Sequence, residues 1–125
     1  MKITNILGRS NSLVKNQFII YDGSKVYFQS YSTLIAVFDS KAKTLRVSKR
    51  YIDEKGSSKI YDCHIATATT RKYFDIFTRN YCKGWQGDFK FLSKIDDIKG
   101  ESFAYQCAQK MKPTSPYYGY WERRK

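Results

Sequence analysis

A chain of 125 residues, 42% of them hydrophobic, is long enough to form one domain whose core needs neither a metal nor a disulfide. Its 23 Lys and Arg residues exceed its 11 Asp and Glu residues, and the net charge of +12 predicts attraction to phosphate backbones or acidic proteins, unless the lysines serve only solubility. No apolar run approaches the length of a membrane span, residues 1–17 lack the apolar core of a signal peptide, and the three cysteines show no close pairing, so we expect a cytoplasmic protein with reduced thiols.

The N-terminal segment is predicted to contain a short helical turn. Ile3, Ile6 and Leu7 fit one face of such a turn. Residues 8–12 then have the glycine, serine and asparagine content that is typical of a loop.

Residues 17–48 show the patterning of four short strands joined by polar links. Between the first two strands, Asp22-Gly23 is the dipeptide that favours a tight hairpin turn. Residues 34–38 are apolar without a break, which suits a central strand covered on both faces. Successive strands with short links predict an antiparallel meander.

The clearest predicted helix covers residues 69–82, where Tyr73, Ile76 and Phe77 lie on one apolar stripe. A helix of this kind buries its apolar stripe against a sheet. We expect this stripe to pack on the side of the sheet that carries four alternating apolar residues, Val26, Phe28, Leu45 and Val47.

The remaining segments allow three further elements. Residues 59–66 fit a fifth strand. A second helix is expected to begin at a cap on Asp88 and to end at Lys99-Gly100. Residues 101–111 fit either a helix or a strand, and their Ala, Gln, Lys and Met content favours the helix.

Together these elements predict a single α+β domain over residues 1–112, with an antiparallel four- to five-stranded sheet (a meander) and two or three helices packed on one face. No internal repeat and no long low-complexity segment divides the chain. Residues 113–125 form a basic, aromatic C-terminal tail with two prolines, which is extended and either docks on the domain or is mobile.

The residue types that carry catalysis are sparse. His64, the single histidine, follows Cys63, and neighbours on a strand point to opposite faces, so the two make a poor nucleophile and base. Three cysteines and one histidine without a CxxC or HxxxH motif argue against a zinc site. The glycines fit neither GxGxxG nor GxxxxGK[ST]. We therefore expect a protein that is not an enzyme and that binds no cofactor and no metal.

Basic and aromatic side chains are the stronger functional signal. On the second and fourth strands, Lys25, Tyr27, Tyr31 and Arg46 alternate with the apolar residues. If these side chains share one side of the sheet, they form a patch with cations for phosphates and rings that stack on bases. The same alternation also describes the solvated face of a half-buried antiparallel sheet. Further candidate partner-binding residues follow the fourth strand, lie on the first helix or belong to the tail: Lys49, Arg50, Arg71, Lys72, Arg79, Tyr118, Trp121, Arg123 and Arg124.

Two motifs carry a resemblance to a known family. FQSYSTLIAVFDS spans Phe28 to Ser40, and TTRKYFDIF spans Thr69 to Phe77. Through them the chain resembles a family of short proteins of unknown function, encoded by phages and mobile elements of Gram-positive bacteria. The chain departs from the family pattern in a longer link before the helix and in its basic, aromatic tail. The resemblance implies a small accessory protein in the cytoplasm of a host cell. Such proteins commonly bind a host macromolecule and block it, as anti-CRISPR proteins do.

Two non-enzymatic functions are expected for such a protein. The first is inhibition of a host defence nuclease or ribonucleoprotein complex, of the anti-CRISPR type, by a basic surface that blocks nucleic-acid binding or cleavage. The alternative is a phage accessory protein that binds DNA or RNA in replication, transcription or packaging. Neither function involves a membrane.

Overall fold

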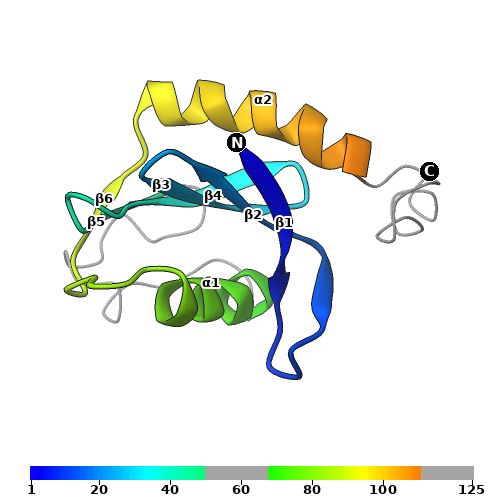
Figure 1. The fold of residues 1–125 in the computed structure, drawn as a ribbon. Helices are drawn as coiled ribbons and strands as arrows, with labels where there is room; N and C mark the ends of the chain where they lie inside the picture. The colour runs from blue at the N-terminus through cyan, green and yellow to red at the C-terminus, as the bar shows by residue number, and fades with distance from the viewer. Residues whose placement is uncertain (50–67, 111–125) are drawn as a thin grey trace.

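The computed structural model describes residues 1–49 and 68–110, which form one sheet between two helices (Figure 1). The predicted fifth strand at residues 59–66 and the tail at residues 113–125 lie outside the described residues. In chain order the elements are β1 (Lys2–Leu7), β2 (Leu13–Asp22), β3 (Lys25–Ser30), β4 (Thr33–Asp39), β5 (Thr44–Val47), α1 (Ala68–Asn80), β6 (Phe89–Phe91) and α2 (Lys94–Lys110).

The strands follow the order β1-β2-β3-β4-β5-β6 in a single sheet. Neighbours from β1 to β5 are antiparallel, which confirms the meander predicted for residues 17–48. β6 pairs with β5 in parallel, and the chain passes through α1 between these two strands, as a parallel pair requires. Over the described residues the sheet is therefore mixed, mostly antiparallel and six-stranded, where an antiparallel sheet of four or five strands was expected.

β1 replaces the helical turn that was predicted at the N-terminus. Ile6 is buried on the α1 side of the sheet, whereas Ile3 packs on the other side in the cluster that contains Ile20. Residues three apart in a strand point to opposite faces, so an extended chain buries one isoleucine in each layer. The helical prediction failed because the same spacing also fits one helical face, and only the neighbouring strand β2 decides between the two.

The apolar stripe of α1 packs on the predicted side of the sheet. Ile76 and Phe77 are buried, and Tyr73 packs against the same cluster. The Phe77 ring stacks on Phe28 with a centroid distance of 5.6 Å, which aligns the middle of the helix with β3. All four expected sheet partners belong to this cluster or pack against it: Val26, Phe28, Leu45 and Val47.

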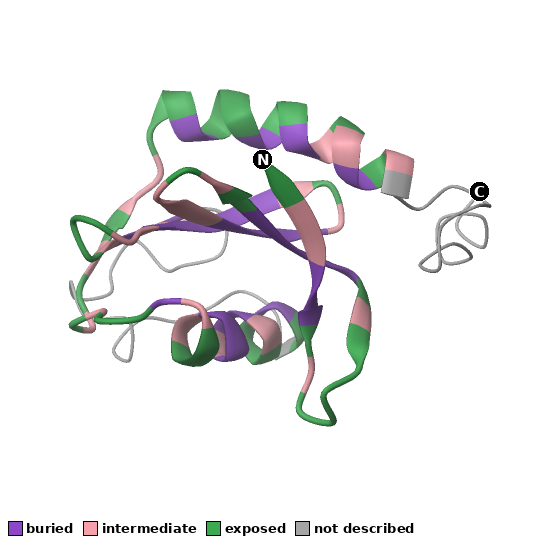
Figure 2. Ribbon diagram, viewed as in Figure 1, coloured by how far each residue is buried: buried purple, intermediate pink, exposed green. Residues whose placement is uncertain are grey.

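α2 covers the opposite face of the sheet, and Figure 2 shows buried residues in both helices and in the strands between them. Tyr27 is 1% exposed, and its ring meets Phe103 edge-on with a centroid distance of 4.8 Å. Val37 and Cys107 belong to the same buried cluster. The expectation that the helices pack on one face is wrong, because β3 and β4 carry large apolar or aromatic side chains on both faces and each face needs its own cover.

α2 begins later than predicted. Residues 89–91 form β6 instead of the first turn of a helix capped by Asp88. The cap is Ser93, whose Oγ accepts a hydrogen bond from Asp96 N at 3.2 Å, while Asp96 Oδ2 accepts one from Ser93 N at 3.0 Å. This reciprocal pair is a capping box, in which each side chain satisfies a backbone N–H of the first turn.

Gly100 lies in the middle of α2 and does not end it. The helix continues to Lys110, so the segment from residue 101 is helical and not a strand. A Cβ atom on Gly100 would lie 2.7 Å from Leu34 Cβ, closer than two carbon atoms can approach without a shift. Glycine at this position therefore lets the helix lie directly on β4.

An ion pair ties the first turn of α2 to β5. Arg46 Nε lies 2.9 Å from Asp96 Oδ2, and Arg46 Nη2 lies 3.3 Å from Asp96 Oδ1, so the guanidinium binds the carboxylate with two hydrogen bonds. The Asp96 side chain is only 2% exposed. Burial raises the pKa of Asp96, but hydrogen bonds from Arg46 and Ser93 outweigh burial and hold the pKa below its ordinary value. One turn later Lys99 Nζ pairs with Asp22 Oδ2 at 2.9 Å.

We expect Gly100→Ala to destabilise the protein, although alanine is favoured over glycine by about 1 kcal/mol in an open helix. The added methyl group would push α2 away from Leu34. Urea unfolding measures the effect. Ser102→Ala, at an exposed position of the same helix, is the control and should change the free energy of unfolding by less than about 0.5 kcal/mol. A stabilised Gly100→Ala protein would show that α2 does not approach β4 this closely.

The Arg46–Asp96 pair should make stability depend on pH in the acid range. Because the folded-state pKa of Asp96 lies below its ordinary value of 3.8, its contribution is complete above that value and is lost as the pH falls through the folded-state pKa. Asp96→Asn should lower the free energy of unfolding at neutral pH, because Arg46 stays partly buried without its counter-ion. The loss should lie near the lower end of the range of about 3–5 kcal/mol that is typical of broken buried pairs. The substitution should also flatten the acid dependence in urea unfolding curves, and equal acid slopes in the two proteins would contradict the pair.

Candidate polyanion-binding site

The basic and aromatic patch predicted on the strands does not form an open surface. Tyr27 is buried beneath α2, and Arg46 is held by Asp96. Tyr31 lies in the turn after β3 with a left-handed φ of 55° and is half-buried, as is Lys25 at the start of β3. The alternation along β3 does not reveal whether water or a second helix covers the side that carries the tyrosines, and here α2 covers it.

The cations predicted on the helix are exposed on α1. Arg71, Lys72 and Arg79 all face solvent. Arg79 pairs with Asp75 one turn earlier at 3.3 Å, and Lys72 Nζ lies 5.3 Å from the centroid of the ring of the next residue. Because Arg46 contacts α2 on the other face of the sheet, the structure does not bring these predicted cations together with it.

The candidates that follow the fourth strand are only partly described. Lys49 is exposed, and its Nζ lies 5.3 Å from the centroid of the Phe91 ring. Its role in binding a partner stays a prediction. The other candidates lie outside the described residues: Arg50, Tyr118, Trp121, Arg123 and Arg124.

A different basic site lies where the end of α1 meets the turn between β4 and β5. A pocket of about 430 Å³, here called the tyrosine pocket, opens at this junction. The sequence prediction named none of its lining residues as a binding residue. The pocket is lined by Tyr21, Phe38, Ser40, Lys43, Asn80, Tyr81 and Lys83.

The β4–β5 turn places Lys43 at this pocket. Asp39 Oδ1 accepts hydrogen bonds from the backbone N–H groups of Lys41 and Ala42, at 2.9 and 3.2 Å, which closes the turn. Lys43 follows with a left-handed φ of 58°. Its aliphatic chain lies against Gly84, where a Cβ atom would be 3.1 Å from Lys43 Cδ and Cε. Glycine at position 84, with a φ of 83°, thus leaves room for the lysine chain.

Two tyrosines form the aromatic wall of the pocket. The Tyr81 ring stacks on Phe77 with planes 17° apart and a centroid distance of 6.2 Å, and its hydroxyl accepts a hydrogen bond from Leu7 N at 3.2 Å. Tyr21 lies on β2 and is 36% exposed. Burial, and then the neighbouring Tyr81, raise the pKa of Tyr21, so its hydroxyl is neutral at physiological pH. Tyr81 is therefore a fixed ring beside a more accessible one.

A second pocket of about 240 Å³ adjoins the tyrosine pocket at Lys43, which lines both. Phe89 and Lys90 of β6 line this second pocket, together with one carboxylate, Asp88. Lys90 pairs with Arg46 in the strand register, and its neighbours Phe89 and Phe91 pack on the α1 side, so the Lys90 side chain points to the α2 side of the sheet. Lys43 and Lys83 line the tyrosine pocket together, and we call these two residues the lysine track.

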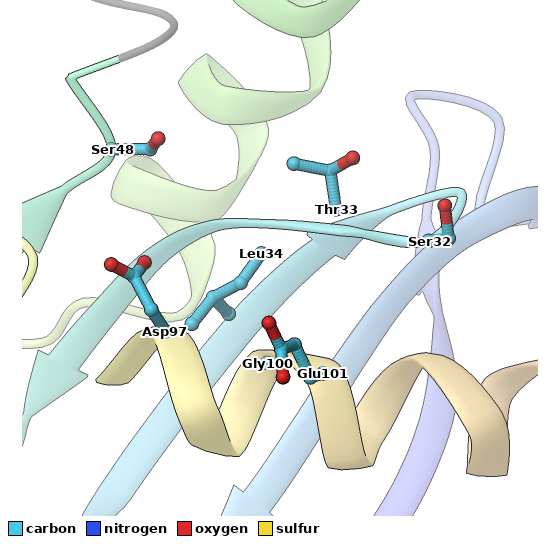
Figure 3. A pocket seen from close by; sticks show the side chains of 7 residues that line it. All are labelled: Ser32, Thr33, Leu34, Ser48, Asp97, Gly100 and Glu101. Atoms are coloured by element: carbon cyan, nitrogen blue, oxygen red, sulfur yellow. The ribbon is translucent and has the colours of Figure 1, made fainter. Parts of the chain in front are cut away.

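Charge is distributed unevenly between the two faces of the sheet. α1 carries three cations and one carboxylate, whereas α2 carries three lysines and three carboxylates. A third pocket, of about 260 Å³, lies between α2 and the turn before β4, and Figure 3 shows Asp97 and Glu101 among the side chains that line it. The pocket beside α2 is therefore lined by two carboxylates, whereas the tyrosine pocket is lined by two lysines and no carboxylate.

The described residues offer few groups for catalysis. Within residues 1–49 and 68–110, no three metal-binding side chains lie together in a way that could hold an ion. Burial raises the pKa of Cys82 to about 12, so this thiol is protonated at neutral pH. Cys63 and His64 lie outside the described residues. Neither described helix is long and apolar enough to cross a membrane.

Comparison with known proteins places the chain in a family without a known function. A family model described as a family of unknown function (DUF8033) matches residues 1–90. The matched stretch contains β1 to β5, α1 and both lysines of the lysine track. Searches of curated proteins and of solved structures found no match. Because the matched stretch is more than half of the chain, the protein belongs to the DUF8033 family.

Proposed function

We propose that this protein is a non-enzymatic binding protein that holds a nucleic acid by its phosphates along the lysine track. The observation that carries the proposal is that Lys43 and Lys83, which come from separate segments, line one pocket, and that Lys43 also lines the pocket that adjoins it. Neighbouring ammonium groups match the repeating phosphates of a nucleic-acid backbone. The net charge of +12 supports this function because a long-range positive potential accelerates the encounter with a polyanion.

A purely structural role for Lys83 makes a different prediction. This lysine lies just beyond the C-terminal end of α1, where a cation stabilises the helix dipole. If that were its role, its replacement would lower the stability of the protein and leave nucleic-acid binding unchanged. Binding and unfolding are therefore measured on the same variants.

We expect Lys43→Ala/Lys83→Ala to weaken the binding of DNA or RNA and to reduce its salt dependence. Each phosphate contact that is lost should lower the slope of log K against log salt by about 0.7–0.9. The matched control is Lys2→Ala/Lys94→Ala, which removes the same charge from exposed positions on β1 and α2. Fluorescence anisotropy titrations at several salt concentrations give both slopes. Equal slopes in the two double variants would show that only the net charge matters.

Inhibition of a host defence nuclease complex, of the anti-CRISPR type, is the second candidate function, and a phage or mobile-element origin is part of it. The outer face of α2 favours a protein partner, because Ile95, Ile98 and Tyr105 are 69%, 66% and 69% exposed. Ile98 and Tyr105 are two helical turns apart and so lie on one line along the helix. Exposed aromatic and large apolar side chains that lie together are typical of protein contact surfaces.

The two candidate functions use opposite faces of the molecule, so surface variants separate them. Ile98→Ser/Tyr105→Ser should abolish the capture of a nuclease-resistant protein complex from host lysate if the second function is correct. The same change should leave the binding of naked nucleic acid intact. Lys43→Ala/Lys83→Ala should have the reverse effect if the first function is correct.

A further inference from the structure

The tyrosine pocket is larger than contacts to phosphates alone require. Its volume of about 430 Å³ falls in the range of about 300–1,000 Å³ that is typical of small-molecule sites. Phe38 is buried and contributes to its apolar lining, and Tyr21 and Tyr81 contribute aromatic rings. Phosphates do not stack on aromatic rings. The pocket therefore suits a flat, uncharged group that is attached to an anion.

The aromatic wall is organised before any ligand binds. Tyr81 is held on one side by Phe77 and at its hydroxyl by Leu7 N, so little side-chain entropy is lost when a second ring stacks beside it. Tyr21 is the more accessible of the two tyrosines. Base–aromatic stacking needs only such a ring and a π-face, and it tolerates any base.

Polar groups in the pocket match the edge of a base. Asn80 adds an amide that both donates and accepts hydrogen bonds. Ser40 Oγ donates to Ser24 O at 2.7 Å, which orients the hydroxyl with its lone pairs free to accept another bond. Lys43 and Lys83 line the same pocket, so phosphate-binding and base-binding groups belong to one site.

We propose that the tyrosine pocket binds an unstacked base, and that the nucleic acid on the lysine track is therefore single-stranded. This inference rests on the proposed function and adds the class of nucleic acid. In a duplex the face of each base is covered by its neighbours, so no protein ring reaches it without unstacking. Lys43 also lines the adjoining second pocket, so a ligand that occupies both hollows is an oligomer and not a single nucleotide.

Four probes at one salt concentration test this inference on the full chain: a short oligothymidine, an abasic oligomer with the same number of phosphates, a duplex of the same length and thymidine monophosphate. The oligothymidine should bind at least about fivefold more tightly than the abasic oligomer, as expected for one stacked base. Tyr21→Ala should remove this difference, and Tyr21→Phe, which keeps the ring, should retain it. The comparison of probes on the unaltered protein stands even where Tyr21→Ala fails to fold.

The outcomes separate the inference from the function on which it rests. Equal affinity for the oligothymidine and the abasic oligomer would overturn the base pocket and leave the lysine track intact. Tighter binding of the duplex would overturn the claim that the ligand is single-stranded. If thymidine monophosphate bound as tightly as the oligothymidine, the claim that the ligand is an oligomer would be wrong. If none of the four probes showed salt-dependent binding, the proposed function itself would be wrong.

Discussion

Tyr27 and Phe28 are neighbours on β3, and they point to opposite faces of the sheet, where each is buried against a different helix. Tyr27 meets Phe103 of α2, and Phe28 meets Phe77 of α1. A strand that buries large rings on both faces requires a layer on each side, because a single helix layer would leave one set of rings in water. The three-layer arrangement follows from this requirement, and the other elements are arranged around it.

The second layer also determines where positive charge remains available. α2 brings Asp96 onto Arg46, and Lys99 onto Asp22, so each of these two cations is paired with a carboxylate. The tyrosine pocket at the end of α1 is lined by Lys43 and Lys83 and by no carboxylate. The proposed nucleic-acid site therefore lies at the α1 end of the molecule and not on the face of the sheet.

Local patterns predicted those parts of the fold that depend on neighbours in sequence. Alternation and the Asp22-Gly23 turn were enough for β2 to β5, and the spacing of Tyr73, Ile76 and Phe77 was enough for α1 and its packing side. β1 was missed although its partner β2 is the next element in the chain, because the spacing of Ile3, Ile6 and Leu7 also fits a helical turn. The start of α2 was missed because it depends on a partner distant in sequence, β5, which pairs with β6 and holds Asp96 through Arg46.

The candidate site could not be predicted from the sequence because three separate segments form it. Tyr21, Lys43 and Lys83 come from β2, the β4–β5 turn and the loop after α1, and each residue alone is unremarkable in its segment. A partial signal existed in the run of basic residues from Lys41 onward without an acid among them. The prediction relied on Tyr27 of β3, which lies on the face that α2 covers.

The opposite burial of adjacent rings is tested most directly by nuclear Overhauser contacts in the NMR spectrum of the full chain. The structure predicts contacts between the ring protons of Tyr27 and Phe103, and separate contacts between those of Phe28 and Phe77, because these ring centroids lie 4.8 and 5.6 Å apart. A Tyr27 ring that shows no contact with Phe103 would contradict the three-layer fold. It would also restore the sheet face as an open surface.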